Sequence, residues 1–201
     1  MNLIIDELPR ALKLKGSVFP IRTDFRIGML FEMMIESREL SDREMARQAF
    51  RLWFEEEQIA AIARQDVVRE ALDGIIWFYS CGKRDEEKEK QGEKKPGEFG
   101  RRIYDFEIDA PLIYAAFRSQ YGIDLQEAQL HWWQFTALFS GLHQDEQIMQ
   151  IMGYRSVNLA EIKNKDERRR LAKLQARYAL PDHRTKEEKQ RLAGALFGGI
   201  R

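Results

Sequence analysis

The sequence predicts a mainly α-helical fold: a helical bundle with a small N-terminal β-hairpin and a mobile charged insert. Three observations favour this class. Apolar residues recur every three or four positions over most of the chain, a short N-terminal stretch alternates with period two, and residues 83–102 are dominated by charge. With 201 residues, 44% of them apolar, the chain is long enough to bury a core and short enough to be one domain.

The hairpin is expected close to the N-terminus. Residues 12–15 alternate between apolar and basic, Gly16 and Ser17 follow, and residues 18–21 are mostly apolar. A glycine in the first position of a two-residue loop favours a type II′ turn. Pro20 has no N–H to donate to a neighbouring strand, which places residues 18–21 at a sheet edge.

Three amphipathic helices are expected between Thr23 and Ser80, because the apolar period there changes from two to about 3.6. A capping box formed by Ser41 and Glu44 predicts the start of the second helix. The apolar stripes of the three helices are, in order, Ile27, Leu30, Phe31 and Met34; Met45, Ala49, Leu52 and Trp53; and Val68, Ala71, Leu72, Ile75, Ile76 and Tyr79.

The insert at residues 83–102 separates two helical halves. Fourteen of its twenty residues are charged, so it has little apolar surface to offset the entropy of ordering and should be mobile. The expected organisation is a hairpin with three helices over residues 1–82, a flexible linker over 83–102, a second helical part over 103–180 and a tail over 181–201. Both halves are expected to share one core, because the entropy of loop closure grows only slowly with loop length.

The second half predicts two antiparallel helices joined by a tight turn, followed by shorter helices. Asp109 is expected to cap a helix whose first turn holds Pro111, and Gly122 to end that helix in the left-handed conformation. Asp124, with Glu127 three residues later, then predicts the start of the returning helix. Apolar residues on two sides of the returning helix place it at the centre of the bundle. Shorter helices are expected around residues 148–152, 159–162 and 171–178.

The sequence offers little for catalysis or for a cofactor. Asp105, Glu107 and Asp109 alternate and could present carboxylates to Mg²⁺, but a solvated edge together with a helix cap at Asp109 is the favoured interpretation. The one cysteine, Cys81, has no histidine nearby in sequence and is expected to be an inert thiol. A single cysteine also favours a reducing cytoplasm. We therefore expect a non-enzymatic protein without a metal or another cofactor.

The aromatic segment around His131 is interpreted as packing. His131 lies on an apolar stripe, which favours a core histidine bonded to a backbone carbonyl over a catalytic or stacking one. Trp132 and Trp133 lack the interleaved basic residues of a platform for stacking bases. Because an indole buries a large apolar area, we interpret both as packing residues, of which at most one could remain exposed for a partner.

The charges balance overall but not locally. Thirty-three basic residues match thirty-three acidic ones, which argues against a strongly basic nucleic-acid-binding protein, and no apolar run is long enough to span a membrane. Residues 161–177 nonetheless carry a basic surplus, and residues 24–57 an acidic one. Solvated helix faces, head-to-tail association of copies and a phosphate-binding patch are all open interpretations. The candidate partner-binding residues are Arg168, Arg169, Arg170, Lys173 and Arg177.

A set of residues, most of them in the second half, is similar to a known family. It comprises Tyr104-Asp105-Phe106, then Asp109, Ala110, Ile113, Tyr114 and Phe117, then Tyr121-Gly122-Ile123-Asp124-Leu125, then His131-Trp132-Trp133 with Phe135, and in the first half Thr23-Asp24-Phe25-Arg26. On these residues the chain resembles, over residues 10–180, the bacteriophage gene-product-fifteen family of siphophages and prophages. We interpret these signature residues as core and cap positions.

The resemblance implies a role in tail assembly. Genes of this family usually lie beside the tail tube gene and just before the tape measure gene, which implies a tail assembly chaperone that is absent from the finished virion. Such a chaperone would bind the tape measure protein, the major tail tube protein or both in the bacterial host cytoplasm, and copies could form a homo-oligomer. The alternative is a nucleic-acid-associated phage protein, for packaging or regulation, that uses the basic patch at residues 168–170. The balanced net charge makes nucleic acid the less favoured partner.

Overall fold

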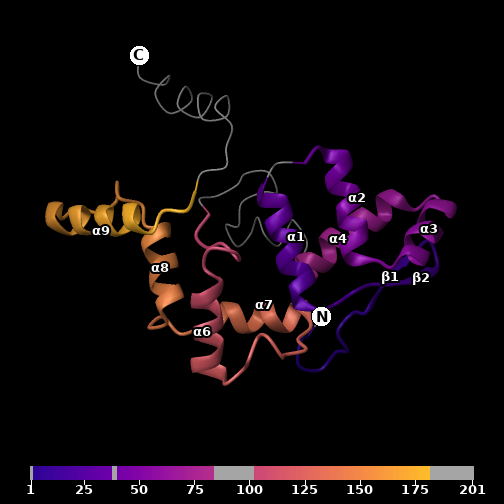
Figure 1. Cartoon of the computed structure of the whole chain (residues 1–201), viewed down its shortest axis with the longest axis horizontal. Helices are drawn as coiled ribbons and strands as arrows, with labels where there is room; N and C mark the ends of the chain where they lie inside the picture. The colour runs from indigo at the N-terminus through magenta and orange to yellow at the C-terminus, as the bar shows by residue number, and fades with distance from the viewer. Residues whose placement is uncertain (1, 38–39, 84–101, 182–201) are drawn as a thin grey trace, which may run out of the picture.

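The computed structural model describes residues 2–37, 40–83 and 102–181. They form a two-stranded antiparallel hairpin and a set of packed helices (Figure 1), which confirms the predicted mainly α-helical class. The elements are β1 Ala11–Leu14, β2 Ser17–Pro20, α1 Phe25–Ser37, α2 Asp42–Trp53, α3 Glu56–Arg64, α4 Val68–Tyr79, α6 Ala110–Tyr121, α7 Trp132–Ser140, α8 Gln147–Ser156 and α9 Lys165–Arg177. The charged segment expected to be mobile lies, apart from Lys83 and Arg102, outside the described residues, as does the tail beyond Pro181.

The hairpin turn differs from the prediction. Leu14 pairs with Ser17, so the two loop residues are Lys15 and Gly16, and their φ angles are both positive, 45° and 85°. Positive φ at both central positions is typical of a type I′ turn, in place of the predicted type II′ turn at Gly16 and Ser17. The pattern alone could not assign the loop, because Lys15 also continues the alternation of the first strand.

The first half contains one more helix than predicted. Four helices, α1 to α4, stand where three were expected, and α3 is the addition. Its apolar residues form one short cluster between Ile59 and Ile62, which gives no 3.6-residue stripe to detect. The predicted capping box at the start of α2 is confirmed, because the backbone N–H of Ser41 donates to the Glu44 carboxylate at 3.0 Å.

In α1 and α4 the buried face is rotated about the helix axis relative to the predicted apolar stripe. Three residues expected in the core are 42–50% exposed, namely Leu30 in α1 and Val68 and Ile76 in α4. On the buried sides of the same helices lie Gly28, which faces an indole of α7, and Gly74, which faces a leucine of β1. The predicted stripes are defined by apolar side chains, so glycine is not counted in them. Yet the close approach that glycine permits decides which side of each helix is buried.

Helix α6 begins and ends as predicted. Asp109 occupies its N-cap position, Pro111 lies in its first turn, and Gly122 follows its last residue with φ 69°. Helices α8 and α9 also match expected segments. The helix expected around residues 159–162 is not formed, and a turn stands there in which the Asn158 side chain accepts the N–H of Ala160 at 3.2 Å. Asparagine side chains that bond nearby backbone in this way favour turns over helices.

The connection between α6 and α7 is longer than the tight turn that was expected. Asp124 does not start a helix; its carboxylate accepts the N–H of Gln126 at 2.9 Å and the hydroxyl of Tyr114 at 3.1 Å. Helix α7 begins instead at Trp132, whose backbone N–H donates to the carbonyl of Thr23 at 2.8 Å. The first half of the chain therefore helps to set where α7 begins, and no local pattern contains that information.

Side chains from both halves meet in one hydrophobic core. Phe135 of α7 is fully buried, and its ring centroid lies 5.0 Å from that of Phe25 in α1 and 5.1 Å from that of Phe117 in α6. Helix α7 crosses the middle of the molecule between α1 and α6 (Figure 1). This is the central place expected for a helix with apolar residues on two sides.

Candidate functional site

His131 has a structural role at the N-terminus of α7. Its Nδ1 accepts the backbone N–H of Trp133 at 3.1 Å, and its Nε2 lies 2.9 Å from the carbonyl oxygen of Pro9. An accepting Nδ1 leaves the proton on Nε2, which donates it to that carbonyl. Burial lowers the pKa of His131, and this favours the neutral ring that the two bonds require. The predicted core histidine bonded to a backbone carbonyl is confirmed.

The two tryptophans join α7 to the end of α4. The indole N–H of Trp132 donates to the carbonyl of Tyr79 at 2.8 Å, and that of Trp133 donates to the carbonyl of Phe78 at 2.7 Å. The last carbonyls of a helix have no partner within the helix, so the two indoles complete the C-terminus of α4. Both indoles are buried, at 3% and 4% exposure, and neither is available to stack on a base.

Most of the remaining signature residues also lie in the core or at helix ends. Ile113, Phe117 and Phe135 are buried, Tyr114, Tyr121, Ile123 and Asp124 are half-buried, and Ala110 and Gly122 are exposed. Gly122 is exposed because it ends α6 in the left-handed conformation. The signature residues therefore belong to the core and helix ends of the second half, and they do not line one cavity.

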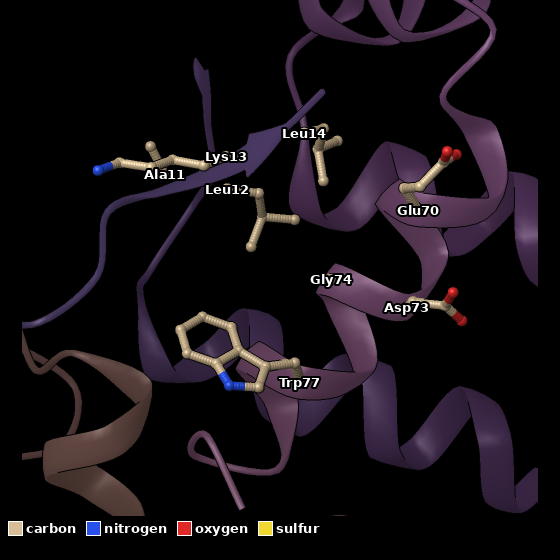
Figure 2. A pocket seen from close by; sticks show the side chains of 8 residues that line it. All are labelled: Ala11, Leu12, Lys13, Leu14, Glu70, Asp73, Gly74 and Trp77. Carbon is tan, nitrogen blue, oxygen red and sulfur yellow. The ribbon is translucent and has the colours of Figure 1, made fainter. Parts of the chain in front are cut away.

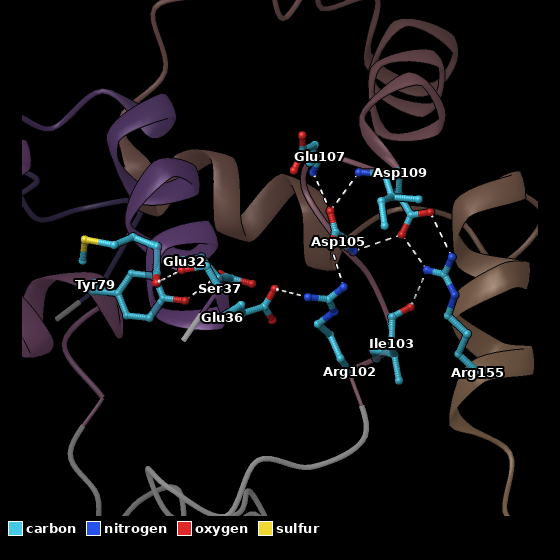
Figure 3. Close-up of polar contacts among 12 residues, drawn as sticks. Glu32, Glu36, Ser37, Tyr79, Arg102, Ile103, Asp105, Glu107, Asp109 and Arg155 are labelled. Atoms are coloured by element: carbon cyan, nitrogen blue, oxygen red, sulfur yellow. Dashed lines mark hydrogen bonds and ion pairs between the residues drawn. The ribbon is translucent and has the colours of Figure 1, made fainter. Parts of the chain in front are cut away.

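Asp109 forms a buried ion pair that the sequence did not reveal (Figure 3). Its two carboxylate oxygens accept from the Arg155 guanidinium at 2.5 and 3.0 Å, and the side chains are 3% and 6% exposed. Arg155 also donates to the backbone carbonyls of Ile103 at 3.0 Å and of Tyr178 at 2.6 Å. The solvated edge expected for Asp109 is thus wrong, because this carboxylate is held inside by an arginine 46 positions away in sequence. Asp109 does occupy the N-cap position of α6, but its side chain makes no capping bond there.

A second polar cluster lies between α1 and the segment before α6 (Figure 3). Arg102 pairs with Glu36 at 3.2 Å and with Asp105 at 2.7 Å, and the hydroxyl of Tyr79 donates to Glu32 at 2.5 Å. Burial raises the pKa of Glu36 to about 7, although Arg102 opposes the shift, and burial also raises the pKa of Glu32. Each of these carboxylates is bonded to an arginine or a tyrosine. Within the described residues no group of side chains is arranged to hold a metal ion.

A groove lies between β1 and α4 (Figure 2). It has a volume of about 590 Å³ and is lined by Ala11, Leu12, Lys13, Leu14, Glu70, Asp73, Gly74 and Trp77. Leu12 and Leu14 point from the strand toward the helix, and Trp77 closes one end of the groove (Figure 2). The indole of Trp77 is 38% exposed, whereas Glu70 pairs with Lys15 at 3.2 Å. An apolar floor with a charged rim suits a segment of another protein.

Sequence reasoning missed this groove, because its two walls come together only in the folded chain. The one local signal is the spacing of residues 70, 73, 74 and 77, which share a face of α4 that mixes acidic, glycine and tryptophan positions. Such a face is neither a clean core stripe nor a solvated one.

The basic residues proposed to bind a partner lie on an exposed helix. Arg168, Arg169, Arg170, Lys173 and Arg177 are all exposed on α9. Within the described residues none of these five side chains forms an ion pair; the Arg177 guanidinium lies over the Tyr178 ring at 5.7 Å. Helix α9 packs against α8 and lies at one end of the longest axis, opposite α3 (Figure 1). None of the described helices combines the length and apolar character of a membrane span.

Comparison with known protein families identifies this chain's relatives. A family model described as "Bacteriophage Gp15 protein" matches residues 4–180, a range that agrees with the resemblance expected over residues 10–180 and leaves the tail outside. No curated protein and no solved structure matches the chain.

Proposed function

This chain belongs to the bacteriophage Gp15 protein family, and on that premise we propose that it is a non-enzymatic tail assembly chaperone. Its partner in this proposal is the tape measure protein, the major tail tube protein or both, bound in the host cytoplasm while the tail forms. The observation that carries the proposal is the groove between β1 and α4, with the partly exposed Trp77 at one end. Partly exposed tryptophans in a concave surface commonly dominate the energy of protein interfaces.

The physical reason for such a role is the nature of the client. A tape measure protein is a long, apolar-rich chain that would aggregate if it were left bare. A small domain with a concave apolar surface and a charged outer face can cover a short stretch of such a chain. Because the client is long, many copies bound in a row would hold it by avidity although each single contact is weak.

The exposed basic face of α9 supports a second contact in the same role. Copies that bind side by side along one client gain from contact with each other, and exposed arginines at one end of the molecule suit an acidic surface on a neighbour. We include a homo-oligomer of this kind in the proposal. No observation favours the alternative of nucleic-acid binding.

Co-expression tests the function. The tagged chain is produced together with the tape measure protein, and separately with the major tail tube protein, of the same phage. We expect the tape measure protein to stay soluble and to co-purify with the chain. Trp77→Ala should weaken co-purification, whereas Ile76→Ala should not, because Ile76 is equally an exposed apolar residue of α4 but does not line the groove. If neither tail protein is solubilised or retained, the proposed function is wrong.

A further inference from the structure

The hairpin has one strand edge that is open and one that is blocked. The ladder bonds of an antiparallel pair alternate. Arg10 accepts from Ile21 at 3.0 Å, so the bonded pairs are Arg10 with Ile21, Leu12 with Phe19 and Leu14 with Ser17. The N–H and C=O groups of Ala11 and Lys13 therefore point away from β2. The sheet of the described chain contains only these two strands.

The other edge cannot take a strand in the same way. Val18 and Pro20 are the residues of β2 whose backbone groups point away from β1. Pro20 has no N–H, so this edge lacks one of the donors that an added strand would need. A proline on an edge strand is one of the means by which proteins prevent edge-to-edge pairing.

The groove lies on the β1 side of the hairpin, because its lining includes residues of β1 and none of β2. All of residues 11–14 line it on one side, and Glu70, Asp73, Gly74 and Trp77 of α4 line it on the other. A strand added beside β1 would therefore place alternate side chains toward Trp77 and Asp73, whereas Gly74 is already covered by Leu12. We infer that β1 binds an extended segment of another protein by strand addition, and that the segment places alternating apolar side chains in the groove and a lysine or arginine beside Asp73.

The carboxylates at the rim of the groove determine which charge the bound segment should carry. Glu70 is already paired with Lys15 at 3.2 Å, whereas Asp73 has no ion-pair partner among the described residues. An extended segment with a basic residue would satisfy Asp73, and an acidic segment would be repelled by both carboxylates.

A second copy of this chain suits the groove poorly as its occupant. The inward side chains of its own β1, Leu12 and Leu14, are only 4% and 6% exposed because they fill its own core. They are not free to enter the groove of a neighbour. The occupant must bring apolar side chains that are unburied before binding, as an unfolded or extended client does.

The test uses a designed probe, so that it does not depend on the identity of the client. A short capped peptide of alternating valine and lysine is titrated into the ¹⁵N-labelled protein. We expect millimolar binding, with amide shifts at residues 11–14 and 70–77. Lys13→Pro should weaken it about tenfold or more, because the proline removes an outward N–H without breaking the ladder to β2. Ala11→Pro tests the same edge if Lys13→Pro disturbs the hairpin.

Val18→Pro is the matched control. Val18 pairs with Lys13 and points its N–H to the other edge, so the same change there should alter binding less than about twofold. A peptide of alternating valine and aspartate should bind more weakly than the lysine peptide. The inference is overturned if the lysine peptide shifts no amides of β1, if binding is unchanged in both Lys13→Pro and Ala11→Pro, or if the β1 amides shift with protein concentration alone, which would indicate a second copy.

This inference deepens the proposed function, because it assigns the binding mode of the same groove. The two fail separately. Peptide binding without co-purification of a tail protein would leave strand addition standing and contradict the chaperone role. Co-purification that survives Lys13→Pro and Ala11→Pro would support the chaperone role and contradict strand addition.

Discussion

Gly28 of α1 lies so close to Trp132 of α7 that a Cβ on Gly28 would overlap the indole ring. Two backbone hydrogen bonds join the same segments of the chain. The N–H of Phe25 donates to the carbonyl of Leu130 at 3.0 Å, and the N–H of Trp132 donates to the carbonyl of Thr23 at 2.8 Å. The indole N–H is in turn bonded to the end of α4. One glycine therefore permits the contact that ties both halves of the chain together.

Replacing Gly28 with alanine should destabilise the protein by about 1–3 kcal/mol, because a buried indole has no room to move and overpacked cores lose about that much. The free energy of unfolding in urea measures the effect. Gly153→Ala in α8 is the control, since nothing lies within 4 Å of a Cβ added there. It should be neutral or stabilise by about 0.5–1 kcal/mol. Equal effects of the two substitutions would contradict the close approach at Gly28.

Breaking the Asp109–Arg155 pair from one side should strongly destabilise the protein. Arg155→Met is expected to lower the free energy of unfolding by about 3–5 kcal/mol, because it leaves a buried carboxylate without its partner. Adding Asp109→Leu should recover part of this loss, since both charges are then gone. Arg118→Met is the comparison: Arg118 is 58% exposed and 4.0 Å from Asp124, and its removal should change stability by less than about 1 kcal/mol.

Features set by neighbouring residues could be predicted from the sequence. Gly122 ends α6 and Glu44 closes the capping box because the backbone groups they serve lie within four positions. The start of α7 was missed because its N-cap is His131, an unusual cap whose ring is fixed by Pro9 from the far end of the chain.

The groove and the buried ion pair lay beyond prediction for a related reason. Asp109 has the sequence context of a helix cap, and only the folded chain brings Arg155 to it. Likewise, Leu12 and Trp77 look like ordinary core residues until the strand and α4 are placed side by side. Long-range contacts decide which of several locally reasonable roles a side chain takes.

Glu36 should make the protein less stable as the pH rises toward neutral. Burial raises its pKa to about 7 in the folded chain, from an ordinary value of 4.5, so between these values the folded state holds more protons than the unfolded state. The free energy of unfolding then falls with pH, by up to about 1.4 kcal/mol per unit for one proton. The contribution is complete below pH 4.5 and lost above 7.

Glu36→Gln should remove this slope, so the stability of the variant relative to wild type should rise between pH 5 and pH 7 and then stay level. Urea unfolding at several pH values measures it. The subtraction cancels the contribution of His131, whose lowered pKa acts in the opposite direction. Glu44→Gln should give a difference that does not vary in this range, because hydrogen bonds from Ser41 lower the pKa of Glu44. A flat profile for Glu36→Gln would show that Glu36 is ionised throughout.

The two ends of the molecule should attract each other in different copies. Arg168 and Arg169 are exposed on α9, and Glu56 and Glu57 are exposed in the first turn of α3 at the opposite end (Figure 1). A contact between ends that do not face each other joins copies head to tail. Single exposed pairs are worth less than about 1 kcal/mol, so the association should be weak and should fall as salt rises from about 0.05 to 0.5 M.

Sedimentation velocity at high protein concentration measures this association, and charge reversal tests its geometry. Changing both arginines to glutamate should abolish self-association, as should changing both glutamates to lysine, because either change sets like charges together. Mixing the two variants should restore association, because the two native ends attract each other and the two reversed ends are also opposite in charge. Arg43→Glu with Arg47→Glu makes the same change in charge on the exposed side of α2 and should leave the association intact. Loss of association in that control as well would mean that net charge, and not contact between the two ends, governs how copies meet.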